Sequence, residues 1–366
     1  MVPDKLISAD SHIVETPDWW AERVDRRYRD QVPRIVENED GSGHTIINFP
    51  GLKPFPARGY IPNAVGQSGR ETGGFWETPA GAFDPVKRLD DMALDGVSAE
   101  VLYPTIGIRT FTIESPELRS VCFKAHNDRM GDYVSHAPDR LLAISMIELD
   151  DIDAGLKELE RCVKMGHRGA MISSSPPASR RYNDPRYDRF WAAASEMNIP
   201  LSLHVLTGTG ERRLNRALLG PQPLFFRLHY VFELQETLIE MIEGGVFERF
   251  PDLRVISVES GVGWMLGFAT NADFAWLRHQ SKLPQKPSCY IHRNVFATFQ
   301  QDSGVAGNVA GGYANFMWAS DYPHGDSIWP VSRQVIEKDF AGMAEADVHA
   351  ITWGNAAKAY KAAHPS

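Results

Sequence analysis

The chain contains little cysteine and no long apolar run, and both absences narrow its class. Its three cysteines, Cys122, Cys162 and Cys289, lie far apart among 366 residues and form no Cys-x-x-Cys pair. This pattern is typical of reduced thiols rather than of a disulfide framework, so we expect a cytoplasmic protein. No apolar run reaches the roughly 18 residues that a membrane-spanning helix needs, and no signal peptide is visible.

Clusters of basic residues are missing as well. The formal net charge is −9 and no Lys/Arg block occurs, which disfavours a broad nucleic-acid-binding surface. No G-x-G-x-x-G motif follows an apolar run, which disfavours a dinucleotide-binding open sheet. The hydrophobic fraction of 43% and the charged fraction of 23% are those of a soluble globular protein. As the partner we expect a small-molecule substrate rather than a nucleic acid.

A long irregular segment, residues 37–84, follows the first apolar run. It is rich in glycine and proline, yet it also carries Phe49, Phe55, Tyr60, Phe75 and Trp76. Loops of this length inside a compact chain are usually functional or disordered, and the aromatic residues favour a packed cap. We therefore expect an insertion that forms part of a substrate pocket, within a single domain that spans residues 1–366.

From residue 85 onward, apolar runs alternate with segments of helical pattern. The runs lie near residues 8, 102, 144, 171, 202, 256, 297 and 318. Near-continuously apolar strands that alternate with helices indicate a parallel sheet, and eight such units indicate a (β/α)₈ TIM barrel of the α/β class. An open, doubly wound sheet is the alternative.

Four of these runs end in residue types that bind metals. Asp10 and His12 end the first run, and residues two apart on a strand point to the same side. His204, Glu259 and Asp321 end three later runs. In a barrel the carboxyl ends of the strands form one face, where the active site lies. Imidazole and carboxylate ligands suit Zn, Mn or Fe(II), so Asp10, His12, His204 and Asp321 are predicted to bind one divalent ion.

Several local motifs extend this pattern. They are Arg-Tyr-Asn-Asp-Pro at 181–185, Gly-Val-Phe-Glu-Arg-Phe-Pro-Asp-Leu at 245–253, Ala-Ser-Asp-Tyr-Pro-His at 319–324 and Gly-Asn-Ala-Ala-Lys-Ala-Tyr at 354–360. With Asp-Ser-His at 10–12, the chain resembles the amidohydrolase superfamily, in the amidohydrolase-related branch that includes aminocarboxymuconate-semialdehyde and γ-resorcylate decarboxylases. The resemblance implies a strand-eight metal ligand at Asp321, and it implies a homodimer, since the branch often assembles this way.

Two positions depart from the branch. Its decarboxylases usually place a histidine after strand six, where this chain has Glu259. Strand four ends in Met171-Ile172-Ser173, so no lysine is placed to form the carbamate that bridges two ions in dinuclear hydrolases. The second departure favours a single ion, unless Glu259 holds a second one.

Catalytic roles follow from a metal-bound water, whose pKa falls to about 7. Asp321 is expected to accept its proton, Glu259 to act as a second base and His324 to polarise the substrate. His229, at the start of a predicted helix, is a further candidate for the site. For substrate binding we expect Arg58, Tyr60 and Arg70 to hold an anionic group and Trp264 to contact an aromatic one.

Three functions are compatible with these residues. The first is a metal-dependent hydrolase of an amide, ester, lactone or thioester, and this is the hypothesis that we favour from the sequence. The second is an oxygen-independent, metal-dependent decarboxylase of an aromatic or enoic acid, which uses the same ligands. The third is a barrel that has lost catalysis and serves in binding or assembly, which the intact ligand set disfavours.

Overall fold

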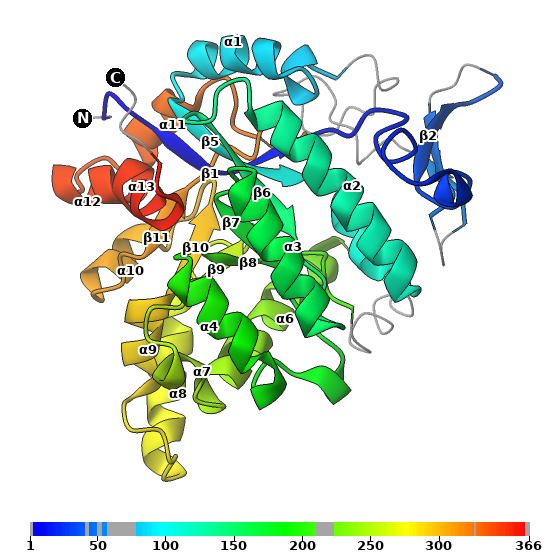
Figure 1. The fold of residues 1–366 in the computed structure, drawn as a ribbon. Coiled ribbons are helices and arrows are strands. Elements are labelled where there is room, and N and C mark those ends of the chain that lie inside the picture. Colours follow the sequence, from blue (N-terminus) through cyan, green and yellow to red (C-terminus); the bar gives the residue numbers. More distant parts are fainter. Residues whose placement is uncertain are drawn as a thin grey trace.

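The computed structural model describes residues 3–40, 44–49, 53–56, 78–209, 223–325 and 327–362. Its centre is an eight-stranded parallel sheet that curls into a nearly closed barrel, with helices around the outside (Figure 1). The strands are β1 (Ile7–Ile13), β5 (Ala99–Pro104), β6 (Leu141–Met146), β7 (Gly169–Ile172), β8 (Leu201–His204), β9 (Val255–Val258), β10 (Val295–Phe299) and β11 (Phe316–Trp318). They pair in this order, so the predicted barrel is confirmed.

The helices follow the strands in alternation. They are α1 (Pro85–Asp95), α2 (Pro116–Val134), α3 (Ile152–Lys164), α4 (Asp188–Glu196), α6 (Pro223–Glu243), α7 (Val246–Arg249), α8 (Met265–Arg278), α9 (Pro287–Asn294), α10 (Val305–Ala310), α11 (Ser332–Asp339), α12 (Glu345–His349) and α13 (Asn355–Tyr360). A π-helical turn, Ala350–Gly354, separates the last two. Residues 345–360 therefore form three consecutive helical segments.

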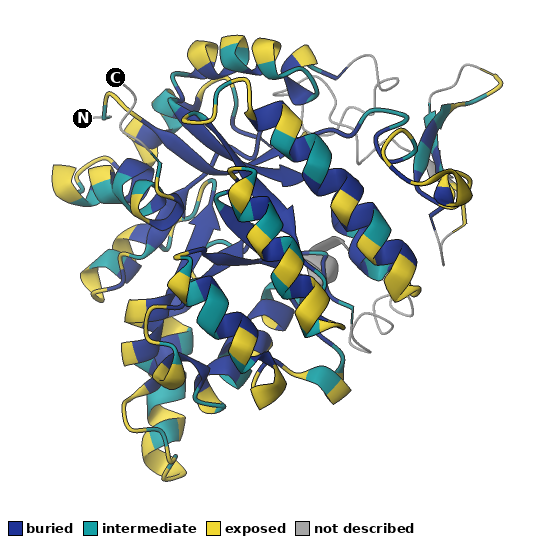
Figure 2. Cartoon of the chain, in the orientation of Figure 1, coloured by how far each residue is buried: buried dark blue, intermediate teal, exposed yellow. Residues whose placement is uncertain are grey.

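Local chemistry explains both kinds of element. Every residue of β6 is buried, as expected for a strand that is covered on both faces. The helix α2 begins after Ser115, whose hydroxyl accepts a hydrogen bond from the Leu118 amide, with Pro116 in the first turn. Figure 2 shows the result: the strands of the barrel are buried, while the helices around them carry exposed residues on the side that faces solvent.

The barrel closes where β1 meets β11. Asp321 N donates to the carbonyl of Asp10 at 3.0 Å, and His12 N donates to the carbonyl of Tyr322 at 2.6 Å. Below them the hydroxyls of Ser8 and Ser320 lie 3.1 Å apart. The two ends of the chain's βα series are thus joined at the level of the predicted metal ligands.

A smaller antiparallel sheet stands beside the barrel. It consists of β2 (Arg34–Glu37), β3 (His44–Ile47) and β4 (Phe55–Pro56), and it was not expected from the sequence (Figure 1). Residues 41–43, 50–52 and 57–77 of the predicted cap lie outside the described residues, so the cap stays a prediction, as does the single domain. Within the described ranges, no helix has the length and apolar character needed to cross a bilayer.

Stability at acidic pH is expected to depend on His167, which is 3% exposed. Burial lowers its pKa to about 4 from the ordinary 6.5. Between these values the unfolded chain binds a proton that the native chain does not, so stability falls as the pH falls. The unfolding free energy of the wild type is expected to fall between pH 7 and pH 5. That of His167→Gln, which lacks this imidazole, is expected to fall by about 2 kcal/mol less.

Urea unfolding at the two pH values measures this difference. The exposed His136 provides the control, because His136→Gln is expected to keep the pH dependence of the wild type. Equal losses in His167→Gln and wild type would contradict the assignment.

Candidate metal centre

Three strands of the barrel carry the predicted metal ligands to its carboxyl-terminal face. Asp10 and His12 lie on β1, His204 ends β8, and Asp321 follows β11. Their side chains are between 0% and 2% exposed. The structure therefore brings together, in a buried position, four residues that the sequence separates by up to 311 positions.

Two overlapping groups of three side chains have ligand atoms spaced to hold an ion, and they share His12: Asp10, His12 and His204, and His12, Asp321 and His324. Asp10 Oδ1 lies 3.4 Å from His12 Nε2 and 3.7 Å from His204 Nε2, while Asp321 Oδ1 lies 3.2 Å from His12 Nε2. Ligands that bind one ion tetrahedrally at about 2.1 Å are about 3.4 Å apart. All three distances are close to that value.

The hydrogen bonds of the imidazoles fix which nitrogen faces the cluster. His12 Nδ1 lies 2.8 Å from the carbonyl of Pro104, and His204 Nδ1 lies 3.0 Å from the carbonyl of Val205. A carbonyl only accepts, so each Nδ1 carries a hydrogen, and Nε2 is the nitrogen that faces the cluster and could bind an ion. Within the described part of the chain, these Nε2 atoms and Asp10 Oδ1 are buried and make no hydrogen bond. Such atoms are costly unless a cation binds them, so this donor set fits a divalent metal.

The electrostatics of the cluster favour positive charge. Burial alone raises the pKa of Asp10, but the imidazoles of His12 and His204 outweigh it and lower that pKa below its ordinary value. The same holds for Asp321. Burial raises its pKa, but the neighbouring His324 and His12 have the larger effect and lower it below the ordinary value. Burial lowers the pKa of His12, yet the two carboxylates hold it well above the ordinary value. Both carboxylates are therefore kept ionised.

His324 and Glu259 lie at the edge of this cluster. His324 Nδ1 lies 3.0 Å from Asp321 Oδ1, and its ring centroid is 4.0 Å from that of His12. Glu259 follows β9, and its Oε2 lies 3.9 Å from His204 Nδ1. Asp321 and Glu259 both have positive φ angles, of 56° and 60°, an uncommon backbone conformation that is found at functional sites.

Other predicted residues are less closely connected with the cluster. His229 lies on α6, with Nε2 3.4 Å from Glu233 Oε1. Trp264 precedes α8, donates to the carbonyl of Gly261 and packs against Phe268. Within the described part of the chain, the groups of three side chains spaced to hold an ion include neither His229 nor Glu259. Three more candidates lie outside the described residues: Arg58, Tyr60 and Arg70.

Two residues that contact the predicted carboxylate ligands were not expected from the sequence. Thr298 donates to Asp10 Oδ2 at 3.2 Å, and Gln300 Nε2 donates to Asp321 Oδ2 at 2.7 Å. Both lie at the carboxyl end of β10, a run that ends without a typical metal ligand. Polar residues at every strand end of the predicted barrel would have been the only signal.

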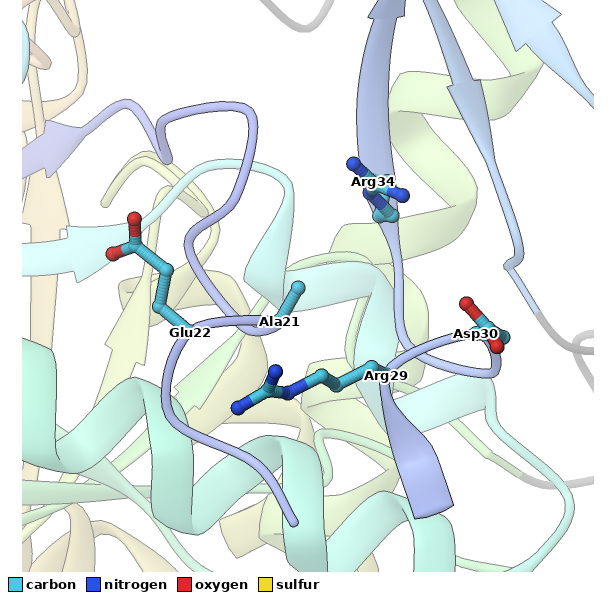
Figure 3. A pocket seen from close by; sticks show the side chains of 5 residues that line it. All are labelled: Ala21, Glu22, Arg29, Asp30 and Arg34. Atoms are coloured by element: carbon cyan, nitrogen blue, oxygen red, sulfur yellow. The ribbon is translucent and has the colours of Figure 1, made fainter. Parts of the chain in front are cut away.

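A separate hollow of about 440 Å³ lies beside the β2 strand (Figure 3). Two arginines and two carboxylates face it together with one alanine: Ala21, Glu22, Arg29, Asp30 and Arg34. None of the cluster residues lines it, and its charges are balanced. It is therefore not part of the metal centre.

Comparison with known proteins distinguishes the two reactions considered above. The chain is 24% identical, over 256 residues, to γ-resorcylate decarboxylase from Polaromonas sp. (strain JS666 / ATCC BAA-500), covering 64% of this chain and 74% of that protein. Other similar curated proteins are decarboxylases as well. The expectation of a hydrolase is therefore wrong, because the similar proteins of known activity support the decarboxylase alternative. The ligands alone did not reveal this, since both reactions use the same set.

Solved structures agree on the fold. An amidohydrolase from Mycobacterium avium subsp. paratuberculosis K-10 superposes with a TM-score of 0.78 at 19% identity, covering 97% of this chain and 98% of the other. A dihydroxybenzoic acid decarboxylase from Polaromonas sp. JS666, with bound manganese and the inhibitor 2-nitroresorcinol, gives a TM-score of 0.66 at 18% identity, covering 98% and 97%. At these identities the likeness shows the fold alone.

The family is shown by a sequence match that covers most of the barrel. Residues 79–362 match the family described as Amidohydrolase. This stretch begins just before α1 and ends after α13, so it includes His204 and Asp321 and seven of the eight barrel strands. The chain belongs to the amidohydrolase family.

Proposed function

We propose that this protein is a metal-dependent decarboxylase that removes a carboxylate from a hydroxylated aromatic acid without using oxygen. The observation that carries the proposal is the buried cluster of Asp10, His12, His204 and Asp321 at the carboxyl ends of the strands, in which Asp10 lies 3.4 and 3.7 Å from the two histidines and Asp321 lies 3.2 Å from His12. The decarboxylase relatives then favour this reaction over hydrolysis.

The ion would be held by His12 Nε2, His204 Nε2, Asp10 Oδ1 and Asp321 Oδ1. Mixed nitrogen and oxygen ligands suit manganese, zinc or iron, and the manganese in similar decarboxylases favours manganese. When bound, the ion supplies positive charge that attracts the substrate's carboxylate and adjacent hydroxyl. A single ion is the simplest arrangement, because Glu259 belongs to neither group of potential ligands within the described residues.

Loss of carbon dioxide breaks the bond between the ring and the carboxylate and leaves the electron pair on the ring carbon. That carbon must then take a proton, so the chain must supply one. His324 Nδ1 lies 3.0 Å from Asp321 Oδ1, which only accepts, so Nδ1 carries a hydrogen. His324 Nε2 lies 3.4 Å from the hydroxyl oxygen of Thr105. We assign His324 as the proton donor to the ring.

Glu259 is the second candidate for proton transfer. Its carboxylate stands beside His204, on the opposite side of that imidazole from the ligand nitrogen. It replaces the histidine that related decarboxylases usually carry after this strand. Substrate contacts by Arg58, Tyr60, Arg70 and Trp264, a role for His229, and the homodimer stay predictions.

The metal assignment is tested by removing single ligands. His204→Ala and Asp321→Asn are each expected to lose bound manganese and turnover, because each removes one of the few ligand atoms while the barrel core is unchanged. Metal content after dialysis measures the loss of manganese, an activity assay measures the loss of turnover, and circular dichroism checks that the fold is unchanged. The exposed His136→Ala is the control. A ligand variant that retained both its metal and its full activity would refute the assignment.

The reaction is tested with a panel of hydroxybenzoic acids under anaerobic conditions with added manganese. We expect release of carbon dioxide and the corresponding phenol, without consumption of oxygen. The matched panel contains esters, amides, lactones and thioesters of similar aromatic acids. Turnover confined to that second panel, with no carbon dioxide from any acid, would eliminate the decarboxylase.

The proton-transfer residues are tested by near-isosteric changes. Glu259→Gln and His324→Asn are each expected to lower kcat about 10²-fold or more, the usual contribution of a positioned acid or base. Manganese content is expected to remain close to that of the wild type, which separates proton transfer from metal loss. Unchanged kcat in either variant would return that residue to a structural role.

A further inference from the structure

The strand β10 contributes no residue to the metal cluster, yet it lies between two strands that contribute to the site. It pairs with β9 on one side, which leads into Glu259, and with β11 on the other, which leads into Asp321. Two polar side chains at its carboxyl end, Thr298 and Gln300, are directed toward the cluster. Each makes one hydrogen bond to a different carboxylate ligand.

The hydrogen bonds of Thr298 leave its hydroxyl one orientation. The side chain is fully buried, and its oxygen accepts from the backbone N–H of Glu259 at 2.8 Å. The hydroxyl hydrogen is then directed to Asp10 Oδ2, 3.2 Å away. Oδ2 is occupied in this way, so Oδ1 is the oxygen that faces His12 and His204.

Gln300 acts in the same way on the other carboxylate. Its Nε2 donates to Asp321 Oδ2 at 2.7 Å, while Asp321 Oδ1 faces His12 and His324. An amide donor in this place satisfies one oxygen without adding charge. The two carboxylates of the cluster therefore share one arrangement, with Oδ2 bound to β10 and Oδ1 directed at the imidazoles.

We infer that Thr298 and Gln300 are positioning residues that orient Asp10 and Asp321 to bind the metal through Oδ1 alone. The inference rests on the proposed metal site. It assigns a function to the carboxyl end of β10, which provides no metal ligand itself. Thr298 has a second effect, because it also holds the backbone of Glu259 in its left-handed conformation, with φ 60°. The position of Glu259 is thereby linked to that of Asp10.

Manganese affinity of the metal-free protein, measured by competition with a chelator, tests the inference independently of activity. Thr298→Val removes the hydroxyl with little change in volume, and Gln300→Met removes the amide with little change in length. Each is expected to weaken manganese binding about 10- to 100-fold, the usual cost of losing a partner that orients a ligand. Thr298→Ser keeps the hydroxyl and is expected to restore most of the affinity.

Two matched variants control for loss of a buried hydroxyl or a neighbouring amide. Thr352 is fully buried and donates to the carbonyl of Val348 within its own helical segment, and Gln301 donates to Asp339. Thr352→Val and Gln301→Met are expected to bind manganese as the wild type does. Thr298→Val is also expected to lower kcat further than Gln300→Met at saturating manganese, since the Thr298 hydroxyl accepts from the Glu259 amide.

The outcomes separate this inference from the proposed function. Wild-type affinity in Thr298→Val and Gln300→Met, with affinity lost in His204→Ala, would overturn the positioning roles and leave the metal site standing. Wild-type affinity in all of these variants would overturn the site itself. Weakened affinity in both β10 variants without decarboxylation by the wild type would support the positioning roles and reject the reaction.

Discussion

The closure of the barrel between β1 and β11 is the constraint on which the rest of the structure depends. Two backbone hydrogen bonds join these strands at the level of the metal cluster, from Asp321 N to Asp10 O and from His12 N to Tyr322 O. The same residues provide three of the four proposed ligands, so the bonds that close the barrel also set the distances between ligand atoms. Small side chains allow the close approach, since the hydroxyls of Ser8, Ser11 and Ser320 lie 2.8–3.3 Å from one another. A barrel that failed to close at this seam would have no metal site.

Buried charge supports the seam from behind. Arg88, on α1, is fully buried, bonds to Glu100 on β5 at 2.5 Å and donates to the carbonyl of His12 at 2.7 Å. Its guanidinium also lies 4.4 Å from the ring centroid of Tyr322. A buried pair gives little net stability because both ions lose their hydration, so its value here lies in fixing geometry. One side chain thus contacts His12 on β1 and Tyr322, which follows β11.

Some residues of this site could be predicted from the sequence and others could not, depending on whether their role shows in the neighbouring residues of the chain. Apolar runs that end in Asp10, His12, His204 and Asp321 carry their own signal, because strand and ligand are adjacent in the chain. Thr298 and Gln300 carry no such signal, since their role depends on the carboxylate that lies across the sheet. The small sheet of β2, β3 and β4 was missed for a similar reason: its short strands lie in a segment dominated by glycine and proline. The reaction was misjudged because hydrolysis and decarboxylation share one ligand set.

What distinguishes the two reactions is the proton chemistry beside the metal, and here the loops after β9 and β10 act together. Glu259 begins the first loop, and Thr298 holds its amide. Further along, the amides of Val262 and Gly263 donate to Asp302 Oδ2, in the second loop, at 2.7 and 2.8 Å. A side chain at Gly261, where φ is +67°, would have its Cβ 2.9 Å from that same oxygen, so glycine is required there. The carboxylate of Glu259 is thus carried by a loop that is fixed at both ends by β10 and its continuation. Because Thr298 also donates to Asp10, one side chain joins Glu259, the proposed proton-transfer residue, to Asp10, a proposed metal ligand.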